Sequence, residues 1–195
     1  MEKKDLKPAG VFKYFEEICQ VPRPSKKEEK MIAYLKAFGA KHNLETKVDE
    51  AGNVLIKKPA TPGKENLQTV VLQSHIDMVC EKNNDVQHDF LTDPIETEID
   101  GEWLKAKGTT LGADNGIGVA TELAILADDS IEHGPLECLF TVDEETGLTG
   151  AFALQEGFMS GDTLLNLDSE DEGEIFIGCA GGIDSVAEFT YKEVE

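Results

Sequence analysis

The N-terminal part of the chain carries its apolar residues at helical spacing. Over residues 8–20 they recur three or four positions apart, and two prolines directly afterwards end the pattern. A second helix is predicted to start near Ser25, because Ser25 followed by Glu28 matches a capping box. The core face of that helix is formed by Met31, Ile32, Leu35 and Phe38. We expect both helices to serve packing alone.

After these helices the pattern changes to the alternation and the short apolar runs that are typical of strands. Strands are predicted at residues 44–48, 54–56, 69–72, 136–142 and 163–167, with a hairpin over 95–104. A buried helix is predicted over residues 117–126 and a short helix near 148–154. Helices that alternate with apolar strands predict an α/β fold, with a mixed, largely parallel sheet flanked by helices on both faces.

The last part of the chain has a different pattern. The glycine-rich residues 178–182 indicate a hinge, and residues 185–194 are predicted to form a single strand. Such a strand has no neighbour with which to pair. We therefore expect residues 1–183 to form most of one incomplete domain and residues 184–195 to begin a second domain.

The composition excludes several classes of protein and of binding partner. The chain has 39 acidic against 18 basic residues, a net charge of −21, which makes nucleic acid and anionic membranes poor partners. No apolar run approaches the ~18–20 residues that cross a bilayer, and the N-terminus does not have the pattern of a signal peptide. The four cysteines lie far apart, which favours reduced thiols over a disulfide framework or a zinc ribbon. We expect a cytoplasmic protein.

Acidic residues and one histidine follow the three predicted apolar strands at the point where each strand ends. The segments are Ser74-His75-Ile76-Asp77, Asp143-Glu144-Glu145 and Asp168. A fourth acid, Asp114, lies in the glycine-rich loop 112–116 that opens a helix. In open α/β sheets, ligands bind beyond the carboxyl ends of the strands. If these strands are parallel neighbours, the acidic side chains converge there.

Converging carboxylates require neutralisation, because two unit charges ~4 Å apart repel by roughly 4 kcal/mol at an effective dielectric of about 20. One imidazole among carboxylates suits zinc, with manganese or cobalt as alternatives, and a bridging carboxylate would give a two-metal hydrolase centre. Taken singly, His75 also fits a core histidine, Asp114 a helix cap, and Glu144 with Glu145 a solvated turn. Because Glu144 and Glu145 are consecutive, their side chains point in different directions. One can therefore bind a metal ion while the other faces the substrate.

Four stretches of this sequence resemble the di-zinc aminopeptidase and aminoacylase group of metallopeptidases. More narrowly, they resemble the bacterial aminoacyl-histidine (Xaa-His) dipeptidases, also called cytosolic non-specific dipeptidases. The stretches are residues 72–79, 111–118, 140–147 and 165–168. The resemblance runs over almost the whole chain and implies the catalytic domain of a zinc exopeptidase.

The resemblance also implies a ligand set. His75 and Asp168 would hold one zinc ion, and Asp114 would bridge it to a second. Glu145 would bind that second ion. Members of the group carry a cis peptide after the bridging aspartate, which here is the bond between Asp114 and Asn115.

The implied reaction is the hydrolysis of dipeptides, of the Xaa-His type and including β-alanyl-histidine, by a zinc-activated water. Glu144 would be the general base, and Asp77 would orient the imidazole of His75. Relatives in this group pair through a lid domain, so the resemblance implies a homodimer for the full-length protein.

One feature departs from the family. The second zinc ion should receive a histidine from a late position, yet none of the four histidines follows Asp168. We therefore expect the chain to be the N-terminal portion of a longer enzyme and to be inactive alone. Two alternatives remain: a non-catalytic metal-binding domain, and a deacylase that acts on N-acyl amino acids.

Overall fold

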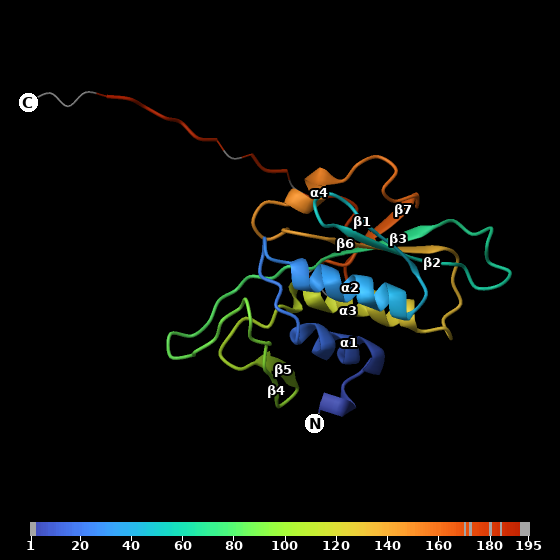
Figure 1. Cartoon of the computed structure of the whole chain (residues 1–195), viewed down its shortest axis with the longest axis horizontal. Helices are drawn as coiled ribbons and strands as arrows, with labels where there is room; N and C mark the ends of the chain where they lie inside the picture. The colour runs from blue at the N-terminus through green and yellow to red at the C-terminus, as the bar shows by residue number, and fades with distance from the viewer. Residues whose placement is uncertain (1–2, 170, 172, 180, 184, 192–195) are drawn as a thin grey trace, which may run out of the picture.

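A five-stranded sheet forms the centre of the structure (Figure 1), a computed structural model that describes residues 3–169, 171, 173–179, 181–183 and 185–191. The strands of this sheet are β1 Glu45–Val48, β2 Val54–Lys58, β3 Val70–His75, β6 Leu136–Thr141 and β7 Thr163–Asn166. The other elements are the 3-10 turn η1 Lys3–Asp5, α1 Ala9–Cys19, α2 Glu29–Lys41, β4 Thr97–Asp100, β5 Trp103–Ala106, α3 Ala113–Ala127 and α4 Thr149–Ala153. The predicted order of helices and strands up to residue 167 is confirmed.

The sheet is mixed, with the strand order β1-β2-β6-β3-β7. The pairs β1/β2 and β2/β6 are antiparallel, whereas β6/β3 and β3/β7 are parallel. In the parallel part His75 lies opposite Thr141, and Gln73 lies opposite Asn166. The strands β6, β3 and β7 are thus parallel neighbours, and their carboxyl ends meet at one edge, as the sequence predicts.

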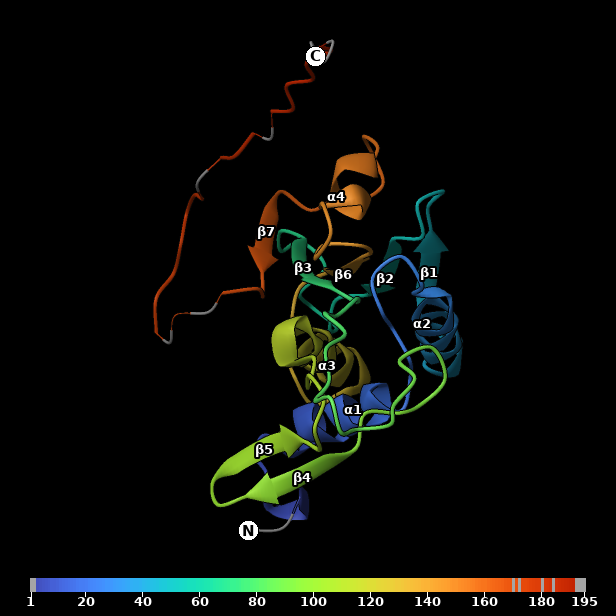
Figure 2. The same ribbon diagram turned by 90° about the vertical axis from the view of Figure 1, so that its left-hand side faces the viewer.

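Helices cover the two faces of the sheet unequally (Figures 1 and 2). Strand alternation divides the core, because successive side chains point to opposite faces. Ile56 and Phe140 belong to the large cluster packed with α1, α2 and α3. On the other face, Leu55, Val71 and Leu139 pack against partly buried residues after α4, namely Leu154, Phe158 and Met159. The expected α/β fold with helices flanking a mixed sheet is confirmed, and α4 is the short element on the second face.

The hairpin β4–β5 lies apart from the main sheet and beside α1 (Figure 2). Two hydrogen bonds join its first strand and the preceding residues to that helix: the amide of Ile95 donates to the carbonyl of Cys19 at 2.8 Å, and the Thr97 hydroxyl donates to Glu16 at 2.7 Å. All four cysteines, Cys19 included, are unpaired thiols. None of the helices in the described part of the chain is both long and apolar enough to span a membrane.

The predicted capping box at the start of α2 is wrong. The helix begins at Glu29, and its first turn is not capped by a side chain. Ser25 instead donates its hydroxyl to Oδ2 of Asp77 at 2.7 Å. Glu28 accepts the amide of Lys26 at 2.8 Å and that of Asp143 at 3.0 Å. Ser25 and Glu28, which match a helix cap in the sequence, therefore bind residues that directly follow β3 and β6.

The predicted C-terminal strand is also wrong within the described residues. Residues 185–191 form no regular element, and the segment runs away from the sheet (Figure 1). No strand of the described sheet is paired with it. Ala180 of the predicted hinge, and residues 184 and 192–195 of the predicted second domain, lie outside the described residues.

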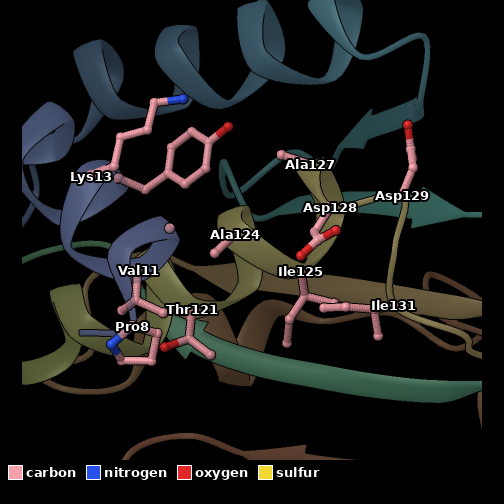
Figure 3. Close-up of a pocket in the computed structure, with 12 residues that line it drawn as sticks. Pro8, Val11, Lys13, Thr121, Ala124, Ile125, Ala127, Asp128, Asp129 and Ile131 are labelled. Atoms are coloured by element: carbon pink, nitrogen blue, oxygen red, sulfur yellow. The ribbon is translucent and has the colours of Figure 1, made fainter.

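A hollow of about 440 Å³ opens between α1 and the C-terminal half of α3 (Figure 3). Its wall is mostly apolar and includes Val11, Ala124, Ile125 and Ile131. Asp114 lies at the opposite end of α3, roughly 10 Å from Thr121, the lining residue of α3 nearest to it in sequence, at a rise of about 1.5 Å per residue. The hollow is therefore separate from the predicted acidic site.

Glu137 on β6 should make the free energy of unfolding depend on pH. Its buried carboxylate accepts bonds from Lys57, Ser160 and Gly161. Burial alone would raise the pKa of Glu137. The hydrogen bonds outweigh this effect and bring the pKa down to about 2. The stabilisation is complete above about pH 4.5, where the unfolded glutamate is ionised, and disappears as pH falls towards 2. We expect Glu137→Gln to lower the free energy of unfolding by roughly 2–3 kcal/mol at pH 7 and by much less at pH 3, as measured by urea denaturation. An equal loss at both pH values would contradict this assignment.

Candidate metal centre

Three of the predicted ligands converge at the carboxyl edge of the sheet. His75 ends β3 and is almost fully buried. Its Nε2 lies 3.0 Å from Oδ1 of Asp114 and 3.8 Å from Oδ2 of Asp168. One donor atom from each residue falls within 4.8 Å of the other two. The parallel order of the strands thus brings together residues that are far apart in sequence.

Asp114 reaches this cluster through an irregular start of α3. Gly112 precedes it with a left-handed backbone (φ +67°), which a side chain at this position would disfavour. Asp114 and Asn115 have non-helical backbone angles, and the peptide bond between them is cis. The first turn of α3 is not capped by a side chain. Asp114 is therefore not a helix cap, and the cis peptide that the resemblance implies is present.

Asn115 is a site residue that the sequence analysis did not assign. Its Nδ2 donates to Oδ1 of Asp168 at 2.7 Å and to the carbonyl of Leu167 at 3.0 Å. The amide of Asp168 donates in turn to Oδ1 of Asn166 at 2.9 Å. These bonds hold the segment after β7 against the start of α3. The signal available in the sequence was its position directly after Asp114 in a glycine-rich loop.

Asp77 lies behind the imidazole and is fully buried. Its Oδ1 is 3.2 Å from Nδ1 of His75. The same carboxylate accepts the Ser25 hydroxyl at 2.7 Å and the amides of Glu144 and Glu145 at 3.0 and 3.3 Å. One carboxylate therefore lies against the ring of His75 and binds the backbone that carries the two glutamates.

The electrostatics of the cluster favour positive charge. Burial lowers the pKa of His75, but the carboxylates of Asp77, Asp114 and Asp168 outweigh this and raise it to about 9. Burial raises the pKa of Asp77, yet its contact with His75 and its hydrogen bonds bring the pKa down to about 2. The imidazole is thus surrounded by negative charge, a potential that attracts cations.

Glu144 and Glu145 lie near the cluster, although neither is among the three donors that fall within 4.8 Å of one another. Burial and the charges of neighbouring carboxylates raise the pKa of both glutamates, with Asp114 the strongest neighbour of Glu145. Burial also raises the pKa of Asp168. Carboxylates held together in this way, beside one imidazole, form a donor set that fits zinc, manganese or cobalt.

A second group of acids, Glu28, Asp77 and Asp143, is buried beside the first. Its oxygens are largely engaged by the protein itself. The hydroxyl of Thr146 donates to Asp143 at 2.5 Å, and Thr149 donates to the other oxygen of the same carboxylate. This group therefore forms a hydrogen-bonded support for the loop after β6.

The comparison with family models decides the assignment. The model of peptidase family M20/M25/M40 matches residues 71–190, which is more than half of the chain and contains every predicted site residue. The chain belongs to peptidase family M20/M25/M40. The resemblance to metallopeptidases seen in the sequence is confirmed.

Individual M20 relatives narrow the comparison. The chain is 54% identical over 183 residues to the cytosol non-specific dipeptidase of Escherichia coli (strain K12), covering 94% of this chain and 38% of the relative. The crystal structure of aminoacylhistidine dipeptidase from Vibrio alginolyticus matches with 55% identity and a TM-score of 0.89, covering 92% of this chain and 36% of that one. The aminopeptidase PepT of Bacillus cereus ATCC 10987 matches at 26% identity and a TM-score of 0.71, over 83% and 43% of the two chains. The chain thus spans less than half the length of each of these relatives.

Proposed function

We propose that this protein is a metal-dependent dipeptidase. The observation that carries the proposal is the convergence of His75, Asp114 and Asp168, with Asp77 behind the imidazole. The identity of 54% to a dipeptidase supports the substrate class. Because this chain spans 38% of that relative, the activity is proposed for the whole protein and not for residues 1–195 alone. As the name of the E. coli relative indicates, the proposed location is the cytoplasm.

In this proposal His75 and Asp168 would hold one zinc ion, Asp114 would be shared with a second ion, and Glu145 would hold that second ion. The separations of 3.0 Å and 3.8 Å from Nε2 of His75 support a common site for His75, Asp114 and Asp168. The charge of Asp114 raises the pKa of Glu145, which supports a place for Glu145 near Asp114. Manganese or cobalt would suit the same donors. When bound, such ions lower the pKa of water towards ~7 and polarise the scissile carbonyl.

Glu144 is the proposed general base. Its carboxylate takes a proton from the attacking water and delivers it to the nitrogen of the leaving amine. Partial burial beside other carboxylates raises its pKa, which brings a glutamate closer to the range in which it exchanges protons near neutral pH. Its backbone amide is held by Asp77 at 3.0 Å, so the base and the imidazole of His75 share one support.

The proposed substrates are dipeptides, with Xaa-His dipeptides such as β-alanyl-histidine among them. The name of the matched Vibrio structure supports this choice. Assays of the full-length gene product with alanyl-histidine, β-alanyl-histidine and an acetylated amino acid, before and after chelation, test it. We expect chelator-sensitive cleavage of the dipeptides. Zinc binding without cleavage would favour a non-catalytic metal-binding domain, and preference for the acetylated amino acid would favour a deacylase.

Replacing Glu145 with glutamine should change stability and zinc binding in opposite directions. Removing one of several neighbouring carboxylates relieves repulsion of about 0.5–1 kcal/mol between partly exposed groups, which should raise the melting temperature of the chelator-treated chain by about 1–3 °C. The same change removes a proposed ligand and should weaken zinc binding. Calorimetric zinc titration and thermal denaturation of Glu145→Gln check both signs. A variant that is less stable and binds zinc normally would exclude Glu145 as a ligand.

A further inference from the structure

Residues 20–28 connect α1 to α2 (Figure 2). Within this connection, residues 23–28 form hydrogen bonds with three of the segments that carry the acidic site. The carbonyl of Arg23 accepts the amide of Met78, directly after Asp77, at 3.2 Å. The guanidinium of Arg23 donates to the carbonyl of Gly112 at 2.9 Å. Glu28 accepts the amide of Asp143 at 3.0 Å. This segment therefore joins the ends of β3 and β6 to the start of α3.

Arg23 lies directly against the backbone turn that presents Asp114. The guanidinium is almost fully buried, and two of its nitrogens, Nε and Nη1, have no hydrogen-bond partner among the described residues. A methyl group added at Gly112 or Gly116 would come within 2.7 or 2.9 Å of its Nη2. Both ends of the turn are thus in contact with the same side chain. A buried cation with incomplete hydrogen bonding is a costly way to fill a core that an apolar residue could fill, which indicates a positional role.

Ser25 acts on the other side of the same cluster. Its hydroxyl donates to Oδ2 of Asp77 at 2.7 Å, and Oδ1 of Asp77 lies 3.2 Å from Nδ1 of His75. Hydrogen bonds to ionised carboxylates are roughly twice as strong as those between neutral groups. The hydroxyl therefore restrains the carboxylate that lies against the imidazole.

We propose that Arg23 and Ser25 are positioning residues of the metal centre, with Arg23 acting through the Gly112–Gly116 turn on Asp114 and Ser25 acting through Asp77 on His75. The inference rests on the proposed metal site and extends it to a segment outside the residues matched by the family model, which begins at residue 71. Its consequence is that the two side chains control metal affinity without touching the metal.

Ser25→Ala tests the second half of this proposal. Residues that orient metal ligands typically contribute about 10–100-fold to metal affinity. We therefore expect zinc binding by the full-length gene product, measured by competition with a chromogenic chelator, to weaken about tenfold or more. Ser25→Thr retains the hydroxyl and should restore most of the affinity. Ser160→Ala is the matched control, because Ser160 also donates its hydroxyl to a buried carboxylate, that of Glu137, at 2.6 Å.

Arg23→Met tests the first half. Lys58→Met is its control, because Lys58 is a buried cation that donates to the carbonyls of Ile125 and Asp128 at the opposite end of α3. We expect Arg23→Met to weaken zinc binding about tenfold and to alter the visible absorption of the Co²⁺-loaded chain, which reports ligand geometry. Lys58→Met should change neither quantity. Thermal denaturation with chelator present reports the loss of stability, which we expect in both variants.

The outcomes separate this inference from the proposed function. If the wild-type chain binds zinc and Ser25→Ala and Ser160→Ala have the same affinity, the positioning role is refuted and the metal site stands. The Ser25 comparison remains decisive if Arg23→Met does not fold. If the wild-type full-length gene product takes up no zinc, the metal site and the positioning role are refuted together.

Discussion

Replacing Glu144 with glutamine is expected to lower kcat for dipeptide hydrolysis by about 10²–10⁴-fold, the usual contribution of a positioned general base. The amide has nearly the same size but cannot accept the proton of the attacking water. The backbone amide of residue 144 still donates to Asp77 at 3.0 Å, so the loop after β6 should keep its place. Zinc affinity should therefore change little.

Steady-state kinetics of the full-length gene product with alanyl-histidine, together with zinc titration of the same preparation, measure both effects. Glu156→Gln is the matched control, because Glu156 is an exposed glutamate after α4 and is absent from the acidic clusters. Its kcat should equal that of the wild type. Near-normal turnover by Glu144→Gln would remove Glu144 from the role of base and leave the metal site intact.

Replacing His75 with glutamine is expected to weaken zinc binding about 10²-fold. Free energies of about 10–16 kcal/mol for structural zinc sites with four ligands correspond to roughly 3 kcal/mol for each ligand, and every 1.4 kcal/mol is a factor of ten. His75 is the only imidazole in the three-residue cluster of the described chain. Its loss also removes the group that the carboxylates of Asp77, Asp114 and Asp168 surround.

His88→Gln is the matched control, since His88 lies outside the acidic clusters and packs against the ring of Phe90 instead. We expect wild-type zinc affinity for it in the chelator competition assay. Thermal denaturation with chelator measures how much of the His75→Gln effect is lost folding stability. Equal zinc affinities for the two variants would place the metal elsewhere in the protein.

Local sequence patterns predicted which residues lie at the carboxyl edge of the sheet. The apolar runs before His75, Asp143 and Asp168 predict strands from short-range periodicity alone, and helices between them predict parallel pairing. The observed order β6-β3-β7 has that pairing. Side chains after parallel strands then have to share an edge, which is why His75 and Asp168 are correctly brought together.

Local patterns failed where a polar group had two possible partners. Ser25 and Glu28 match a capping box, and the nearest free donors in sequence are those of the following helix. In the structure Ser25 binds Asp77, 52 positions away, and Glu28 binds the amide of Asp143, 115 positions away. A buried carboxylate requires donors, but only the packed structure determines which donors are near. Arg23 and Asn115 escaped assignment for the same reason.

The sequence by itself determined the mixed α/β fold, the positions of the strands and the identity of the acids at their ends, because these depend on periodicities of two to four residues. Only the tertiary structure decided that Ser25 donates to Asp77, that Arg23 donates to the carbonyl of Gly112, that Asn115 binds Asp168, and that residues 185–191 form no strand. Hydrogen-bond partners depend on distances in space between segments remote in sequence. A strand likewise depends on a neighbour that can pair with it, which a single segment does not specify.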